Sequence, residues 1–82
     1  MSMDDKTISL LQERLAELHV ALLRKRSEVS NLTVGYQRAR AGLSPIPAEP
    51  LERNLVAKRA ELTALEEQAA AVASQLPAAG NP

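Results

Sequence analysis

An apolar repeat at alternating steps of three and four residues runs through most of the chain, and it constrains the fold more than any other feature. In the first half ten of its eleven positions are apolar, the exception being Lys25, and in the second half seven of eight are apolar, the exception being Lys58. A sustained repeat of this kind specifies helices that supercoil around one another. The positions are Ile8, Leu11, Leu15, Leu18, Leu22, Lys25, Val29, Leu32, Tyr36, Ala39 and Leu43, then Leu51, Leu55, Lys58, Leu62, Leu65, Ala69, Val72 and Leu76.

Glycine and proline divide this repeat into two helices. Gly42 suits the left-handed position that follows a helix C-terminus, and Leu43 suits the apolar contact that often accompanies it. Residues 44–49 contain two prolines and are not expected to be helical. Pro50 fits the first position of a second helix, and Pro77 ends it. We therefore expect one domain over residues 1–82, with a helix over 4–41, a loop over 42–49, a helix over 50–76 and a flexible tail over 77–82.

The two halves of the repeat pair completely when the chain folds back on itself about residue 47. In that antiparallel register Lys25 faces Ala69 and Tyr36 faces Lys58, and every other position of the second half faces an apolar residue of the first. The sequence therefore predicts an all-α fold, a two-helix antiparallel coiled-coil hairpin.

Charged residues beside the seam favour the same register. Arg26 meets Glu66 and Arg40 meets Glu52, so both pairs are opposite in sign. Exposed ion pairs contribute little stability, about 0–1 kcal/mol each, but they help to select register and orientation.

The two seam lysines have two interpretations. A polar residue at a core position can set the register at some cost in stability. Alternatively, each lysine lays its methylene groups along the seam and sends its ammonium group into water. In the predicted register Lys58 is also expected to lie over the ring of Tyr36.

A hairpin this small buries little apolar surface, so we expect another protein surface to cover part of it. The expected partner-binding residues are Ile8, Leu11 and Leu15, which overhang the end of the second helix, and Val20, Leu23 and Val34, which follow helical steps on the outer side of the first. They predict self-association, most simply two hairpins in a four-helix bundle, or docking on a larger helical partner. The alternative is that they are ordinary apolar surface.

A modest basic zone in the first helix suggests a second function, an accessory role in binding nucleic acid. Its candidate phosphate contacts are Arg24, Lys25, Arg26, Arg38 and Arg40. Against this function, the chain has no net charge and a single aromatic residue, so it lacks a platform on which bases could stack.

The residues needed for catalysis or metal binding are scarce. There is no cysteine, and His19 is the only histidine. No phosphate-binding loop, zinc-protease motif or nucleophile elbow occurs. The sequence therefore predicts no enzyme activity, no metal, no cofactor and no small-molecule substrate.

Membrane association and export are also unexpected from this sequence. No apolar run approaches the roughly 20 residues that span a bilayer, and the N-terminal residues lack the pattern of a secretory signal. We expect a cytoplasmic protein, and the richness in Ala, Arg and Leu is typical of bacterial or phage genomes of high GC content. The sequence as a whole predicts an interaction module, such as an adapter, a co-chaperone or an assembly subunit.

Overall fold

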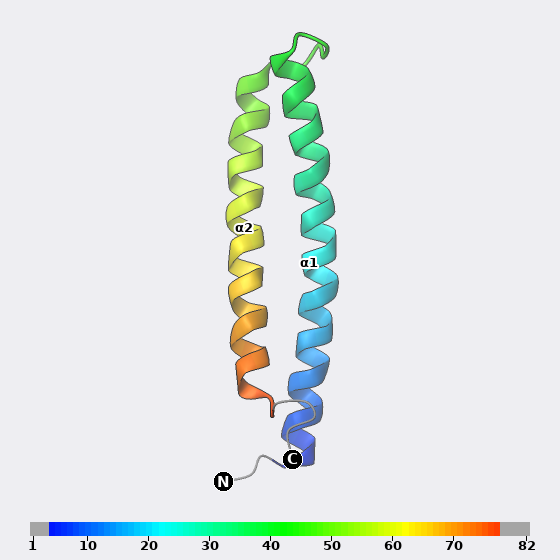
Figure 1. Ribbon diagram of the computed structural model, residues 1–82, viewed down its shortest axis with the longest axis vertical. Helices are drawn as coiled ribbons and strands as arrows, with labels where there is room; N and C mark the ends of the chain where they lie inside the picture. The colour runs from blue at the N-terminus through cyan, green and yellow to red at the C-terminus, as the bar shows by residue number, and fades with distance from the viewer. Residues whose placement is uncertain (1–3, 78–82) are drawn as a thin grey trace.

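The structure, a computed structural model, describes residues 4–77. Two helices, α1 (Asp5–Arg40) and α2 (Ala48–Gln75), run antiparallel and lie side by side along their length (Figure 1). They form a rod of 59 × 18 × 18 Å. The prediction of an all-helical fold with two helices packed against each other is confirmed, and residues 4–77 contain no strand.

Both ends of α1 are capped by local hydrogen bonds. At the start, the Thr7 backbone N–H donates to the Asp4 carboxylate over 2.7 Å, which satisfies one of the free donors of the first turn. At the end, Gly42 has a φ of 74°, and the N–H groups of Gly42 and Leu43 donate to the carbonyls of Ala39 and Arg38. The predicted role of Gly42 is confirmed, because this is the hydrogen-bond pattern of a left-handed C-terminal cap.

Leu43 does not take the place that the sequence predicted. Its side chain is 77% exposed, so it neither packs against the last turn of α1 nor forms a seam layer with Leu51. Because Gly42 ends the helix, the chain leaves the seam before Leu43 is reached.

The helix α2 begins at Ala48, two residues before the expected start at Pro50. Pro50 is therefore the third residue of the helix. It is tolerated there because the first four N–H groups of a helix have no partner within it. At the other end the Leu76 N–H donates to Ala73 O over 3.2 Å. Most of the expected flexible tail, residues 78–82, lies outside the described residues.

The predicted seam forms the core. Apart from Leu43, every predicted seam position is buried or half-buried. The most deeply buried are Leu18, Leu22, Leu55 and Ala69, each with 3–7% of its surface exposed. Ala69 joins Leu18 and Leu22 in one cluster, and the half-buried residues packed around that cluster are Leu15, Leu62, Leu65 and Val72.

Both seam lysines direct their ammonium groups to carboxylates at the edge of the seam. Lys25 Nζ lies 3.2 Å from Glu28 and 3.5 Å from Glu61. Lys58 Nζ lies 3.5 Å from Glu28 and 3.6 Å from Glu61. These four residues, the Lys–Glu quartet, form a closed ring of ion pairs that spans both helices. The lysine side chains are only 18% and 30% exposed, so their stems fill the seam while their charges are paired.

The quartet shows that the predicted register is wrong by one heptad. In the predicted register Lys25 would be level with Ala69, eight residues from Glu61 and about 12 Å along the axis from it. In the structure Lys25 contacts Glu61, and Ala69 packs with Leu18 and Leu22 instead. The chain folds about residue 44 because α1 ends at Arg40 and α2 begins at Ala48.

The other contacts predicted beside the seam have mixed outcomes. The Arg26–Glu66 ion pair is confirmed, at 3.6 Å. No ion pair joins Arg40 to Glu52 in the described chain, and the Arg40 guanidinium lies over the ring of Tyr36 instead, 5.9 Å from its centroid. The predicted contact between Lys58 and the ring of Tyr36 is therefore wrong, because Lys58 belongs to the quartet and Arg40 covers the ring.

Stability is expected to depend on pH through the quartet and the N-terminal cap. The hydrogen bond from Lys25 lowers the pKa of Glu28 from its usual value of 4.5. The hydrogen bond to Glu28 raises the pKa of Lys25 above 10.5. The hydrogen bond from the Thr7 N–H lowers the pKa of Asp4 below 3.8.

The carboxylates stabilise the fold above their usual pKa values, and this contribution is lost as the pH falls through the lowered ones. The Lys25 contribution is present below pH 10.5 and is lost as the pH rises through the raised pKa. We therefore expect the Tm, followed by circular dichroism, to be highest between about pH 5 and 10 and to fall on both sides.

A matched pair of variants isolates the quartet. Glu28→Gln should lower the Tm at neutral pH and lessen its fall in acid. Glu67→Gln, at an exposed position outside the quartet, should behave as wild type. Identical acid profiles for the two variants would contradict a stabilising role for the quartet.

Candidate functional site

Three large apolar side chains lie exposed on the outer side of α1, away from α2. Val20 is 50% exposed, Leu23 is 65% exposed and Val34 is 46% exposed. Ser27 and Ser30 lie between them at the same helical steps, and both are exposed. We call these five residues the outer stripe of α1. It is a continuous, mostly uncharged track along the helix surface.

The overhanging residues that the sequence predicted as a partner site are less accessible than the outer stripe. Leu15 packs against the core cluster, and Ile8 and Leu11 are half-buried. The register explains the difference, because α2 reaches one heptad further along α1 than predicted. The C-terminal end of α2 lies beside the N-terminal turns of α1 (Figure 1). The structure thus places the predicted partner residues in two groups. Only Val20, Leu23 and Val34 are exposed together.

Four other exposed apolar residues had no place in the predicted partner site. Leu10 is 57% exposed, Val56 is 61% exposed and Ile46 in the loop is 52% exposed, while Leu43 had been assigned to the seam. No periodic signal in the sequence marks the first three. Isolated apolar side chains are common on protein surfaces, so we assign them no role.

Interactions within the hairpin already hold most of the basic residues proposed for phosphate binding. Lys25 belongs to the quartet, Arg26 pairs with Glu66, and Arg40 covers Tyr36. Within residues 4–77, Arg24 and Arg38 are exposed, and no ion pair holds either of them. The basic zone is therefore mostly committed to the fold.

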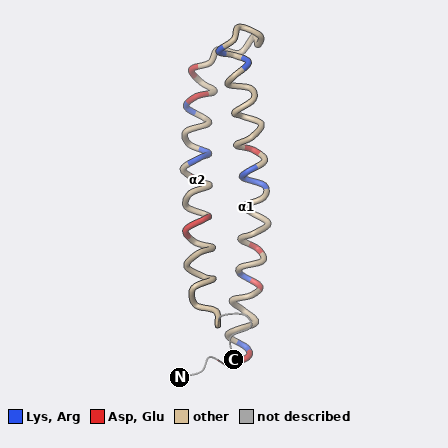
Figure 2. Tube along the Cα trace, viewed as in Figure 1, with Lys and Arg blue, Asp and Glu red and all other residues tan. Residues whose placement is uncertain are grey.

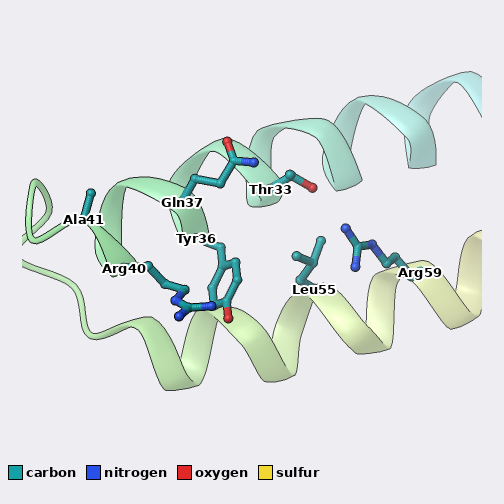
Figure 3. A pocket seen from close by; sticks show the side chains of 7 residues that line it. All are labelled: Thr33, Tyr36, Gln37, Arg40, Ala41, Leu55 and Arg59. Carbon is teal, nitrogen blue, oxygen red and sulfur yellow. The ribbon is translucent and has the colours of Figure 1, made fainter.

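The loop end of the hairpin carries an open hollow of about 580 Å³ between the two helices. Figure 3 shows Arg40 and Arg59 at its two ends, with Tyr36 and Leu55 between them. Its remaining lining residues are Thr33, Gln37 and Ala41. The lining includes no carboxylate, imidazole or thiol, and the Thr33 hydroxyl donates to the Val29 carbonyl over 2.8 Å. The hollow therefore offers guanidinium groups but no acid–base or nucleophile–base pair.

Metal-binding and membrane-spanning features are missing from the part of the chain that the structure describes. His19 is exposed, and no three His, Cys, Asp or Glu side chains there lie close enough to hold a metal ion. None of the helices found between residues 4 and 77 is both long enough and apolar enough to cross a membrane.

No protein-family model, curated protein or solved structure matches this chain.

Neighbouring leucines provide a direct test of which side of α1 is buried. Leu22→Ala removes a 5%-exposed core side chain and should cost about 2–5 kcal/mol of unfolding free energy. Leu23→Ala changes a 65%-exposed side chain and should cost no more than about 0.5 kcal/mol in dilute solution. Urea titrations at low micromolar concentration measure both values. Equal losses, or a larger loss for Leu23→Ala, would contradict the placement of the outer stripe.

Proposed function

We propose that this protein is a non-enzymatic interaction module that binds protein through the outer stripe of α1. The observation that carries the proposal is the exposure of Val20, Leu23 and Val34 on one helix face, at 46–65% each. In the described chain only four apolar residues, Leu18, Leu22, Leu55 and Ala69, are fully buried. Exposed apolar side chains grouped along one surface are typical of sites that bind protein. An adapter, a co-chaperone or an assembly subunit would use such a surface in the same way.

The chemistry of the outer stripe favours a helical partner over nucleic acid. Valine and leucine at helical steps, separated by serines, let a second helix pack closely. Phosphate binding needs unpaired cations, but Lys25 and Arg26 are already in ion pairs. The chain has one aromatic residue, Tyr36, and an arginine covers its ring.

The test compares capture of protein by matched variants of the immobilised hairpin. Wild-type protein incubated with an extract of the cells that produce it should retain protein that Leu23→Lys loses by at least about tenfold, because the substitution places a charge in an apolar contact. Val56→Lys, at a comparably exposed position on α2, should retain protein as wild type does. Retention that is the same for all three would contradict the proposal.

A further inference from the structure

The hollow at the loop end presents two arginines that have no carboxylate partner. Arg40 and Arg59 stand at its two ends, and Figure 3 shows both side chains pointing toward the space between them. Both are exposed, and no ion pair holds either one within residues 4–77. Two like charges that line one hollow repel each other, so an anion placed between them is attracted by both.

The Arg40 guanidinium is held by its face, which leaves its edges available. Its Cζ atom lies 5.9 Å from the centroid of the Tyr36 ring. Contact with an aromatic ring uses the face of the guanidinium plane, so the N–H groups at its edges can still donate hydrogen bonds. A carboxylate can accept two parallel bonds from such an edge. The stacking therefore orients Arg40 for an acidic ligand without occupying its donors.

The two guanidinium groups lie closer together than the backbones that carry them. With the chain folded about residue 44, Arg59 is level with residue 29, so its Cα atom lies about 16 Å along the axis from that of Arg40. Long side chains on a helix lean toward its N-terminus, and in an antiparallel pair these two lean toward each other. A reach of about one turn on each side leaves about 6 Å between the charges along the axis.

This spacing matches alternate side chains of an extended peptide. Residues i and i+2 of such a segment point to the same side and lie about 6.6 Å apart. A segment with a carboxylate at each of these positions can place one on Arg40 and one on Arg59. The exposed Gln37 amide lines the same hollow and can both donate and accept, as a bond to a peptide group requires.

The surroundings of the hollow are also basic. Residues 33–59, at the loop end of the rod, carry five basic and two acidic side chains (Figure 2). A local excess of positive charge steers an acidic partner toward this end. The charged residues are Arg38, Arg40, Arg53, Lys58 and Arg59, against Glu49 and Glu52.

The nearest carboxylates on the same side of α2 do not neutralise the two arginines. Glu52 lies one heptad before Arg59, and no ion pair joins it to either arginine in the described chain. Glu66 lies one heptad after Arg59 and pairs with Arg26 at 3.6 Å. The charge of the hollow is therefore available to a ligand.

We propose that this hollow binds an extended acidic segment of another protein, with two alternate carboxylate side chains on Arg40 and Arg59. The site is separate from the outer stripe and does not depend on the proposed function. A nucleic acid fits it less well, because a phosphate backbone follows a continuous basic track, whereas the neighbouring Lys25 and Arg26 are already in ion pairs.

Titration with short capped peptides, followed by nuclear magnetic resonance, tests the ligand. The peptide Ser-Glu-Thr-Glu-Ser should give saturable shifts of the amides around the hollow, and its affinity should fall with salt. The peptide Ser-Gln-Thr-Gln-Ser should give none. The peptide Ser-Glu-Glu-Thr-Ser has the same charge but places its carboxylates on opposite sides, and should bind at least about fivefold more weakly. Equal affinity for the two acidic peptides would overturn the proposal.

Matched arginine variants test the site. Arg40→Gln and Arg59→Gln should each raise the dissociation constant of Ser-Glu-Thr-Glu-Ser about fivefold, because each removes one charge-assisted contact. Arg53→Gln makes the same charge change at an exposed position outside the hollow and should raise it no more than about twofold. Glu52→Gln should lower it. A loss with Arg53→Gln as large as with Arg59→Gln would overturn the assignment to the hollow.

Two other probes distinguish the sources of the negative charge. Free glutarate should bind more weakly than Ser-Glu-Thr-Glu-Ser, and so should a single-stranded oligothymidylate. Tighter binding of either probe that depends on Arg40 and Arg59 would overturn the assignment to a peptide. Leu23→Lys, in the outer stripe, should leave peptide binding unchanged, so this site is tested separately from the proposed function.

Discussion

The Lys–Glu quartet is the contact on which the rest of this hairpin depends. Two lysines occupy core positions of the seam, with their stems in the seam and their ammonium groups paired with carboxylates at its edge. Only when the seam closes about residue 44 does each lysine, Lys25 and Lys58, lie within 3.6 Å of both Glu28 and Glu61. A polar contact of this kind selects one register where apolar packing alone would permit several. The extent of α2 along α1 follows from it, as does the burial of Leu15.

The sequence predicts the seam well and its register poorly, for one physical reason. A heptad repeat is unchanged by a shift of seven residues, so two registers both pair apolar side chains at every layer except the two that contain a lysine. The Arg26–Glu66 pair does not distinguish them, because either register leaves the two side chains within reach. Glu28 and Glu61, on the opposite flank, do distinguish them, because only the observed register brings each carboxylate to both lysines. The C-terminal cap at Gly42 also shortens α1 and leaves Leu43 outside the seam.

The predicted partner-binding residues also differ in whether their exposure depends on the register. The overhang of Leu11 and Leu15 depended on the register, and the register shift takes Leu15 into the core. The exposure of Val20, Leu23 and Val34 depends only on their position on the side of α1 opposite the seam, which the helical periodicity sets. It is therefore independent of where the chain folds back. One property of the surface needs the fold as well as the sequence. Residues 4–23 and 64–77 together carry six acidic and two basic side chains, and only the antiparallel hairpin gathers them at one end of the rod (Figure 2).

The most direct test of the register is a distance within one chain. Spin labels at Gln12→Cys on α1 and Asn54→Cys on α2 occupy exposed positions, and dilution into unlabelled protein removes distances between chains. The observed register predicts an axial separation of about 32 Å, whereas the register shifted by one heptad predicts about 42 Å. The shorter distance would support the quartet as the contact that aligns the helices. The longer distance would contradict that role of the quartet and would place Leu15 beyond the C-terminal end of α2.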